Sequence, residues 1–304
     1  MVIELTFLGT SQAVPTAKRN HTAILLRYKN ESILVDCGEG TQRQFRIAGI
    51  NPCKLIKLLI THWHGDHCLG IPGLIESLSH LERKEEMSIY GPENSDKRIK
   101  NFFSAIELKP KFKINVDSIN LDAYKTKKIL SNEAGTISTM AVAHKGVKCL
   151  AYSYSEPDKR KINIEYTKKF GLTQHPLLGK LQAGQTITYE GKKITPEKGT
   201  YLVPGKKITY ITDTKYDKRL VKFAKDSDVL ICESTYSEQD SEKAEKRGHF
   251  TAKQAAQLAK ESRSKKLILT HFSQKYSNDK VLLEEAKSIF KDSFTAHDFL
   301  KVEV

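Results

Sequence analysis

The stretch LIKLLITHWHGDH at residues 55–67 decides the fold of this chain. Its first seven residues are almost continuously apolar, which is typical of a strand buried on both faces of a sheet. The next six residues place four side chains that can bind a metal ion directly after that strand: His62, His64, Asp66 and His67. Gly65 lies among them and permits a tight turn of the backbone. We therefore expect a metal-binding loop at the end of a central strand.

Two metal ions would need more ligands than this loop supplies. Three further candidates also follow apolar, strand-like segments: His144, Asp213 and His271. Because adjacent strands of a sheet end at a common edge, we expect these side chains to meet the loop there. The ligands could then form two sets that share Asp213, namely His62, His64 and His144 on one side and Asp66, His67 and His271 on the other.

This ligand chemistry suits a borderline cation such as zinc, while manganese and iron also accept imidazole and carboxylate ligands. Two such ions roughly 3.5–4 Å apart can hold a hydroxide between them and clamp both oxygens of a phosphoryl displacement. Single histidines are more often structural than catalytic. His80, His175 and His297 lack the strand-end context, so we expect them to be surface or core residues.

The rest of the chain alternates strand-like and helix-like segments, which predicts an α/β protein. Strands are expected at residues 2–8, 23–28, 32–36, 55–61, 87–91, 137–143, 149–155, 207–212, 228–232 and 266–270. Helices are expected at residues 39–48, 69–81, 97–108, 217–225, 251–261 and 280–290. Residues 156–184 break the pattern, since they are rich in lysine and contain glycine and proline. A loop of this length in a compact domain is usually functional or disordered.

Composition restricts the setting in which the protein works. The net charge of +14 over 304 residues favours polyanionic partners such as nucleic acid, although a solvated lysine-rich surface would give the same number. The five cysteines are scattered and contain no CxxC pair, which favours a reducing compartment without a disulfide framework. No apolar run reaches the roughly 18 residues of a membrane span. A cytoplasmic protein without membrane contact is the simplest interpretation.

The motif HxHxDH after an apolar strand resembles the metal-binding motif of the metallo-β-lactamase superfamily. The longer stretch THWHGDHCLGIPGLI, at residues 61–75, is closer to the ribonuclease Z family of short tRNA 3′-processing endonucleases. Further blocks resemble this family in the expected order: FLGTSQAVPT (7–16), VDCGEGTQRQ (35–44), ITDT (211–214), ESTY (233–236), GHFTAKQAAQLA (248–259) and LTHFSQKY (269–276). The resemblance therefore runs over nearly the whole chain.

This resemblance implies a four-layer αβ/βα sandwich formed by one domain over residues 1–304, with a projecting basic arm at about residues 156–184. It implies two zinc ions per subunit, held by the two ligand sets given above. It also implies cleavage of precursor tRNA after the discriminator nucleotide, which leaves a 3′-hydroxyl on the tRNA and a 5′-phosphate on the trailer. Family members of this length form homodimers, in which the arm of one subunit presents tRNA to the other.

Two residues would transfer protons in such a reaction, and a third would position one of them. Asp66 would orient the attacking water and accept its proton. His249 would donate a proton to the leaving 3′ oxygen, because imidazole titrates near neutral pH. Glu233 would orient His249 and hold it protonated.

Substrate contacts are expected in the arm and in the loop that follows Pro15. The expected phosphate-binding residues are Lys159, Arg160, Lys161, Lys168, Lys169 and Lys180 in the arm, and Lys18, Arg19 and Asn20 in the loop. The family's loop often reads PxKxRN, whereas Ala17 occupies the usual lysine position here, so the response to mature CCA ends is open. Cys232 stands where a histidine often precedes the glutamate, and the arm has less glycine and proline than usual at its tip.

Two other functions are compatible with parts of the sequence. A metallo-β-lactamase-type phosphodiesterase or lactonase acting on small molecules would keep every metal ligand and would not need the basic arm. A non-catalytic RNA-binding protein would keep the basic arm but would need no intact ligand set, and the ligand set is complete.

Overall fold

The computed structural model describes residues 2–304 and divides into two compact units. The larger unit consists of Met1–Tyr154 and Lys207–Val304, and the smaller unit is Ser155–Lys206. The smaller unit is therefore an insertion in the chain of the larger one. In the described part of the chain, no helix is both long enough and apolar enough to cross a membrane.

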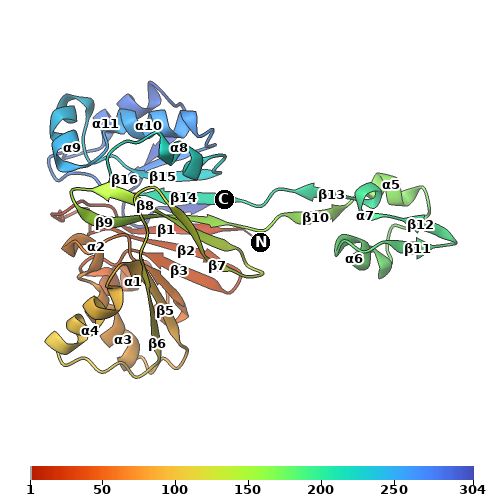
Figure 1. Ribbon diagram of the computed structural model, residues 1–304, viewed down its shortest axis with the longest axis horizontal. Helices are drawn as coiled ribbons and strands as arrows, with labels where there is room; N and C mark the ends of the chain where they lie inside the picture. Colours follow the sequence, from red (N-terminus) through yellow and green to blue (C-terminus); the bar gives the residue numbers. More distant parts are fainter. Residues whose placement is uncertain (1) are drawn as a thin grey trace. The chain divides into compact units, whose positions relative to one another are not determined.

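Two seven-stranded sheets form the centre of the larger unit (Figure 1). The first sheet has, in order, β18 (Lys301–Glu303), β1 (Glu4–Gly9), β2 (Ala23–Tyr28), β3 (Glu31–Val35), β4 (Lys57–Leu59), β5 (Met87–Pro92) and β6 (Ile114–Ile119). Its strands from β18 to β3 pair antiparallel, and those from β3 to β6 pair parallel. The parallel half carries the expected central strand, β4, whose three residues are all buried.

The second sheet follows the same plan. Its order is β17 (Ser293–Thr295), β16 (Leu267–Thr270), β15 (Val229–Glu233), β14 (Lys207–Ile211), β9 (Val147–Ser155), β8 (Thr136–His144) and β7 (Thr126–Ser131). The strands β14 to β17 pair parallel, whereas β7 and β8 pair antiparallel. Three of the expected ligand-bearing strands, β8, β14 and β16, thus belong to one sheet.

Helices cover the outer face of each sheet (Figure 1). Beside the first sheet lie α1 (Thr41–Ile47), α2 (Gly65–Cys68), α3 (Ile71–His80) and α4 (Ser95–Ala105). Beside the second lie α8 (Arg219–Ala224), α9 (Ser241–Arg247), α10 (Ala252–Glu261) and α11 (Lys280–Lys287). The layers are therefore helix, sheet, sheet and helix, which confirms the predicted four-layer αβ/βα sandwich.

Side-chain alternation along the strands explains this layering. In β2, Ile24 and Leu26 pack into the core between the two sheets, whereas Ala23 and Leu25 pack into the core beneath the helices. Successive side chains of a strand point to opposite faces, so a strand with apolar residues on both faces needs a layer on each side. Thr251 is the N-cap of helix α10, and its hydroxyl accepts a hydrogen bond from the Gln254 amide at 3.2 Å, within a capping box.

The smaller unit corrects the expectation of an irregular loop at residues 156–184. It contains β10 (Lys159–Ile162), α5 (Ile164–Lys168), α6 (Leu177–Gln182), β11 (Ile187–Tyr189), β12 (Lys192–Ile194), α7 (Pro196–Gly199) and β13 (Thr200–Val203). It also extends to Lys206 rather than ending at Gly184. Four buried residues, Leu172, Leu181, Ile187 and Ile194, form a separate small core. The loop prediction failed because these apolar residues are far apart in a lysine-rich segment.

Candidate active site

The expected ligands lie at carboxyl ends of strands from both sheets. His62 follows β4 after two residues, His144 is the last residue of β8, Asp213 comes shortly after β14, and His271 follows β16 directly. Asp66 and His67 lie on the short helix α2. Asp213 and His271 have φ angles of 46° and 61°. Such left-handed backbone is unfavourable for residues with a side chain and is concentrated at functional sites.

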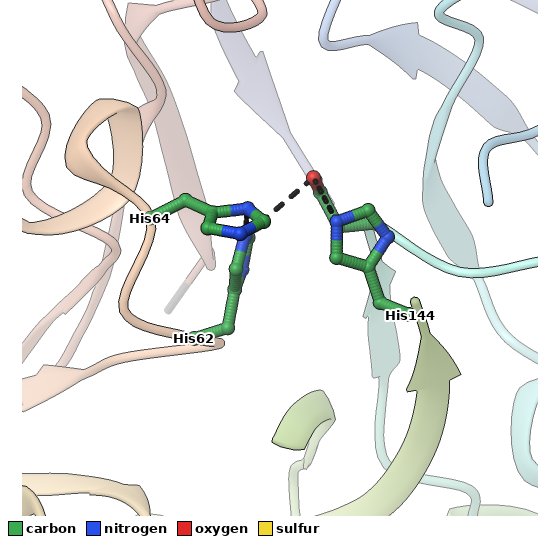
Figure 2. A group of neighbouring side chains, drawn as sticks. His62, His64 and His144 are labelled. Carbon is green, nitrogen blue, oxygen red and sulfur yellow. Dashed lines mark hydrogen bonds and ion pairs between the residues drawn. The ribbon is translucent and has the colours of Figure 1, made fainter. Parts of the chain in front are cut away.

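One group of side chains brings together His62, His64, His144 and Asp213. Figure 2 shows the three imidazole rings turned toward one another from the loop after β4 and from the end of β8. The Nε2 atom of His62 is 2.9 Å from Nδ1 of His64. All four potential ligand atoms lie within 4.8 Å of one another. This is the first ligand set that the sequence suggested.

A second group contains Asp66, His67 and His271. The Nε2 atoms of His67 and His271 are 3.2 Å apart, and both face Oδ2 of Asp66, at 3.4 and 3.6 Å. Both histidines are fully buried. This group corresponds to the second ligand set that the sequence suggested.

The carboxylate of Asp213 lies between the two groups. Its Oδ2 atom is 3.6 Å from Nε2 of His62 and 3.7 Å from Nε2 of His144. Its other oxygen, Oδ1, is 3.1 Å from Nε2 of His271 and 3.4 Å from Nε2 of His67. Each oxygen therefore faces a different set of histidines, which is the arrangement expected of a residue shared by two ions.

The donor atoms fit a divalent cation, and four of the five imidazoles, those of His62, His67, His144 and His271, are held in place by a contact on the side away from the centre. The outward-facing Nδ1 atoms lie near Thr61 Oγ1 for His62, Asp36 Oδ2 for His67, the Gly248 carbonyl for His144 and Thr235 Oγ1 for His271. These distances are 3.1, 2.8, 3.0 and 3.0 Å in that order. Metal-binding histidines characteristically make such a second contact, which fixes the ring and leaves Nε2 free for the ion.

The charges inside this buried cluster shift its pKa values in opposite directions. Burial and the neighbouring His67 lower the pKa of His62 well below its usual value. Burial opposes the charge on His67 as well, but Asp66, Asp213 and Asp36 outweigh it and raise the pKa of His67. Although burial alone would raise the pKa of Asp213, its histidine neighbours hold it well below the ordinary range. Asp66 behaves likewise, since burial would raise its pKa, but His67 and His271 outweigh burial and lower it. The carboxylates of Asp66 and Asp213 therefore both carry negative charge toward the centre, where a cation would sit.

His249 lies beside the ligand groups and faces a different partner. Its Nδ1 atom is 2.9 Å from Oε2 of the fully buried Glu233 and 3.9 Å from Oδ2 of Asp213. Burial would lower the pKa of His249, but the charge of Glu233 and the hydrogen bond to it raise the pKa to about 9. The Glu233 carboxylate also accepts hydrogen bonds from the Thr214 amide and the Thr235 hydroxyl. The structure thus brings together the predicted pair of His249 and Glu233.

Comparison with known proteins covers the whole chain. The chain is 38% identical over 305 residues to ribonuclease Z of Methanothermobacter thermautotrophicus, and the match covers all of this chain and 97% of the relative. It is 36% identical to ribonuclease BN of Cronobacter sakazakii, covering 99% of this chain and all of the relative. The chain belongs to the ribonuclease Z family.

Solved structures place this ribonuclease Z chain within a wider fold. It superposes on human short-form tRNase Z with a TM-score of 0.72 at 25% identity, covering 98% of both chains. The metallo-β-lactamase fold protein YhfI of Bacillus subtilis matches with a TM-score of 0.68 at 21% identity over both full chains, which shows a common fold. A family model described as anti-Pycsar protein Apyc1 matches residues 3–293. The fold and the histidine–aspartate cluster together identify a divalent-metal site.

Sequence reasoning missed two groups of the ribonuclease Z site. Asp36 is fully buried after β3 and contacts His67 while accepting hydrogen bonds from the Thr61 amide and hydroxyl. Its place at a strand end is the same signal that identifies the expected ligands His62, His144, Asp213 and His271, so it could have been found in that way. The backbone amide of Ala13 donates to Oδ2 of Asp66 at 2.8 Å. No residue pattern indicates that hydrogen bond.

The loop candidates occupy different environments. The Arg19 guanidinium donates to Thr10 Oγ1 and the Ala296 carbonyl, pairs with Asp279 at 3.2 Å and lies over the Phe272 ring. The Asn20 side chain donates to the Glu39 carbonyl at 2.8 Å. Both residues therefore hold the loop in place, and their contact with substrate stays a prediction. Lys18 is exposed.

The buried contact between Asp36 and His67 leads to a testable prediction. Asp36→Asn keeps the shape of the side chain and tolerates the φ of 59° at this position, but it removes the negative charge behind His67. We expect metal affinity to fall about 10- to 100-fold, as is typical for loss of such a partner. Metal bound per chain, measured against buffered free zinc, checks this. The exposed Asp96→Asn variant is the control, and equal affinities of the two variants would contradict the role of Asp36.

Proposed function

We propose that this protein is a metal-dependent endoribonuclease that removes the 3′ trailer from tRNA precursors, leaving a 3′-hydroxyl on the tRNA and a 5′-phosphate on the trailer. The observation that carries the proposal is the placement of His249 and Glu233 beside the two ligand groups, in a chain of the ribonuclease Z family. Metal-site residues alone would also suit a hydrolase of small phosphodiesters. A paired acid beside them suits a substrate with a poor leaving group.

The metal site is proposed to hold two zinc ions in each chain. His62, His64 and His144 would bind one ion, Asp66, His67 and His271 the other, and Asp213 both. When bound, such a pair acidifies water and offsets charge on the phosphate oxygens. The support is the division of the donor atoms into two groups, each facing its own oxygen of Asp213.

The chain's own residues then have distinct roles in the proposed reaction. Asp66 would orient the attacking water and accept its proton, and the Ala13 amide fixes the Asp66 carboxylate in place. His249 would donate a proton to the leaving 3′ oxygen of the tRNA. Glu233 holds His249 in position through the 2.9 Å contact with Nδ1, which leaves Nε2 available to donate.

Asp66 provides the first test of this function. A 3′-extended precursor tRNA is incubated with the protein, and the new 3′ end and the 5′ end of the trailer are mapped. We expect a single cut after the discriminator nucleotide by the unchanged protein and no detectable cut by Asp66→Ala, because ligand and base are lost together. Equal cleavage by the two proteins would overturn the proposed mechanism.

His249 is tested by changing the leaving group. We expect His249→Ala to lower kcat for precursor tRNA by about 10²- to 10⁴-fold, the usual range for loss of a general acid. Bis(p-nitrophenyl) phosphate releases a stable phenolate that needs no proton, so its hydrolysis should fall far less. Glu233→Gln should show the same selectivity with a smaller loss. An equal loss on both substrates would count against His249 as the proton donor.

The insertion Ser155–Lys206 is proposed to be an arm that binds tRNA. Lys161, Lys168, Lys169 and Lys180 are exposed on it and available to phosphates. Two other predicted contacts are already engaged within the arm, since Lys159 pairs with Glu156 and Arg160 donates to Thr200 Oγ1 at 3.0 Å. Lys192, Lys193 and Lys198 are exposed as well and add to the positive charge.

Excising the arm tests its part in the reaction. The Glu156 amide donates to the Lys206 carbonyl at 2.8 Å, so the two ends of the insertion are neighbours and a short glycine linker can join them. We expect loss of precursor tRNA cleavage, because the phosphate contacts disappear, and continued hydrolysis of bis(p-nitrophenyl) phosphate. Loss of both activities with metal still bound would contradict a role limited to tRNA binding. The matched control replaces only the exposed Leu202 by serine.

We further propose a homodimer and a reducing, cytoplasmic setting. The dimer is inferred from the ribonuclease Z family, whose short members place the arm of one subunit against tRNA bound to the other. The setting is supported by five free cysteines, four of them buried. Sedimentation equilibrium would decide the oligomeric state, and a monomer at micromolar concentration would contradict the dimer.

A further inference from the structure

A basic surface pocket lies beside the active site and has no role in the mechanism described so far. It is lined by Lys145, Glu242, Lys243, Lys246 and Arg247 and has a volume of about 420 Å³. Four cationic side chains thus meet a single carboxylate. The pocket forms where the turn between β8 and β9 meets the end of helix α9.

The backbone connects this pocket directly to the catalytic groups. Lys145 follows the ligand His144, and Arg247 is separated from His249 only by Gly248. The Gly248 carbonyl lies 3.0 Å from Nδ1 of His144. A side chain at Gly248 would come within 3.4 Å of both His144 and Lys145, which shows how closely the two segments approach. The same two segments therefore hold the pocket and two histidines of the site.

The conformation of Lys145 argues that its charge has a function. Lys145 and Gly146 form the two-residue turn between β8 and β9, with φ angles of 42° and 76°. Turns that need positive φ at both central residues strongly favour asparagine, aspartate or glycine at the first. A lysine there is unfavourable by comparison. Such an outlier beside an active site is a reason to look for a function of the side chain.

The charges of the pocket are only weakly neutralised. Within residues 2–304, no carboxylate lies within ion-pair distance of Lys145 or Lys246, whereas nearby Lys215 is paired with Glu245. The Arg247 guanidinium donates to the Tyr236 hydroxyl at 3.2 Å, and Lys243 lies over the Tyr236 ring. Unpaired cations converging on one concave surface favour an anionic ligand.

We propose that this pocket binds a backbone phosphate on the tRNA side of the scissile bond and so sets which bond enters the site. This inference rests on the proposed function, since it requires RNA at the metal site. The choice of side follows from His249, which would donate its proton to the 3′ oxygen of the tRNA. The pocket is built from residues adjoining His249, so the nucleotides that precede that oxygen are its natural occupants.

A purely structural explanation exists and gives a different outcome. Lys246 and Arg247 lie in the last turn of α9, where cations stabilise the helix dipole. In that case their removal would lower the stability of the protein and leave RNA binding unchanged. The experiment therefore has to measure stability and binding separately.

The main comparison uses two double variants of the full-length protein. Lys145→Asn/Lys246→Gln removes two pocket cations, and asparagine suits the turn. Lys222→Gln/Lys260→Gln removes two exposed lysines from the last turns of α8 and α10 and is the control. Both are made in an Asp66→Asn background so that the precursor tRNA stays intact, and dissociation constants are measured from low to high salt.

We expect weaker binding at low salt for the pocket variant, with a salt slope reduced by about 0.7 for each single-strand phosphate that the protein no longer neutralises. The control variant should keep the parent slope. Glu242→Gln supplies a change in the opposite direction: removing the one carboxylate should tighten binding. A pocket variant and a Glu242→Gln variant that both bind like the control would overturn the inference, whatever their unfolding midpoints.

Two further measurements separate this inference from the function on which it rests. With native Asp66 present, failure of the protein to cleave precursor tRNA at all would refute the proposed function itself. Normal cleavage by the parent, with unchanged binding by the pocket variant, would refute only the phosphate pocket. Precursors with one-nucleotide and long trailers should show the same defect, and a defect confined to long trailers would contradict the assignment to the tRNA side.

Discussion

The buried carboxylate of Asp213 is the group on which the rest of the site depends. Its two oxygens face two different pairs of histidines at 3.1 to 3.7 Å, and both the carboxylate and these four histidines are buried. A buried carboxylate is costly unless positive charge or hydrogen bonds compensate it. Histidines alone supply this only when protonated, whereas divalent cations supply it at any pH at which they stay bound. The arrangement of side chains around Asp213 is therefore the one expected of a metal-binding site.

The fold brings together the ligands that surround Asp213. Asp213 and these ligands come from the ends of β4, β8, β14 and β16 and from helix α2, and so from both sheets. Only a face-to-face arrangement of the sheets, with matching strand ends, brings these segments together. The apolar core between the sheets, formed by residues such as Ile24 and Tyr152, fixes that arrangement. The packing of this core, away from the ligands themselves, thus determines the distances between the ligand atoms.

Much of the site is predictable because strand ends leave a clear trace in sequence. An apolar run that stops at a histidine or aspartate identifies His62, His144, Asp213 and His271, and the structure confirms their common location. Asp36 follows the same pattern, but the Ala13 amide cannot be found in this way, because a backbone group has no identity in sequence. The small core of the arm escapes prediction for another reason: its buried members, from Leu172 to Ile194, are separated by many polar residues and show no regular period.

The fold does not by itself determine which substrate the metal site acts on. A family model described as anti-Pycsar protein Apyc1 spans residues 3–293, and ribonuclease Z relatives match the same chain, so a match to the fold alone does not fix the substrate. Three features beyond the common fold could contribute to the choice of substrate: the lysine-rich arm, the loop held by Arg19, and the basic pocket at Lys145. A polymer of phosphates can make many contacts, whereas a small phosphodiester has a single phosphate. Under the proposed function, selectivity for tRNA would come from the sum of separate phosphate contacts, each weak and salt-dependent.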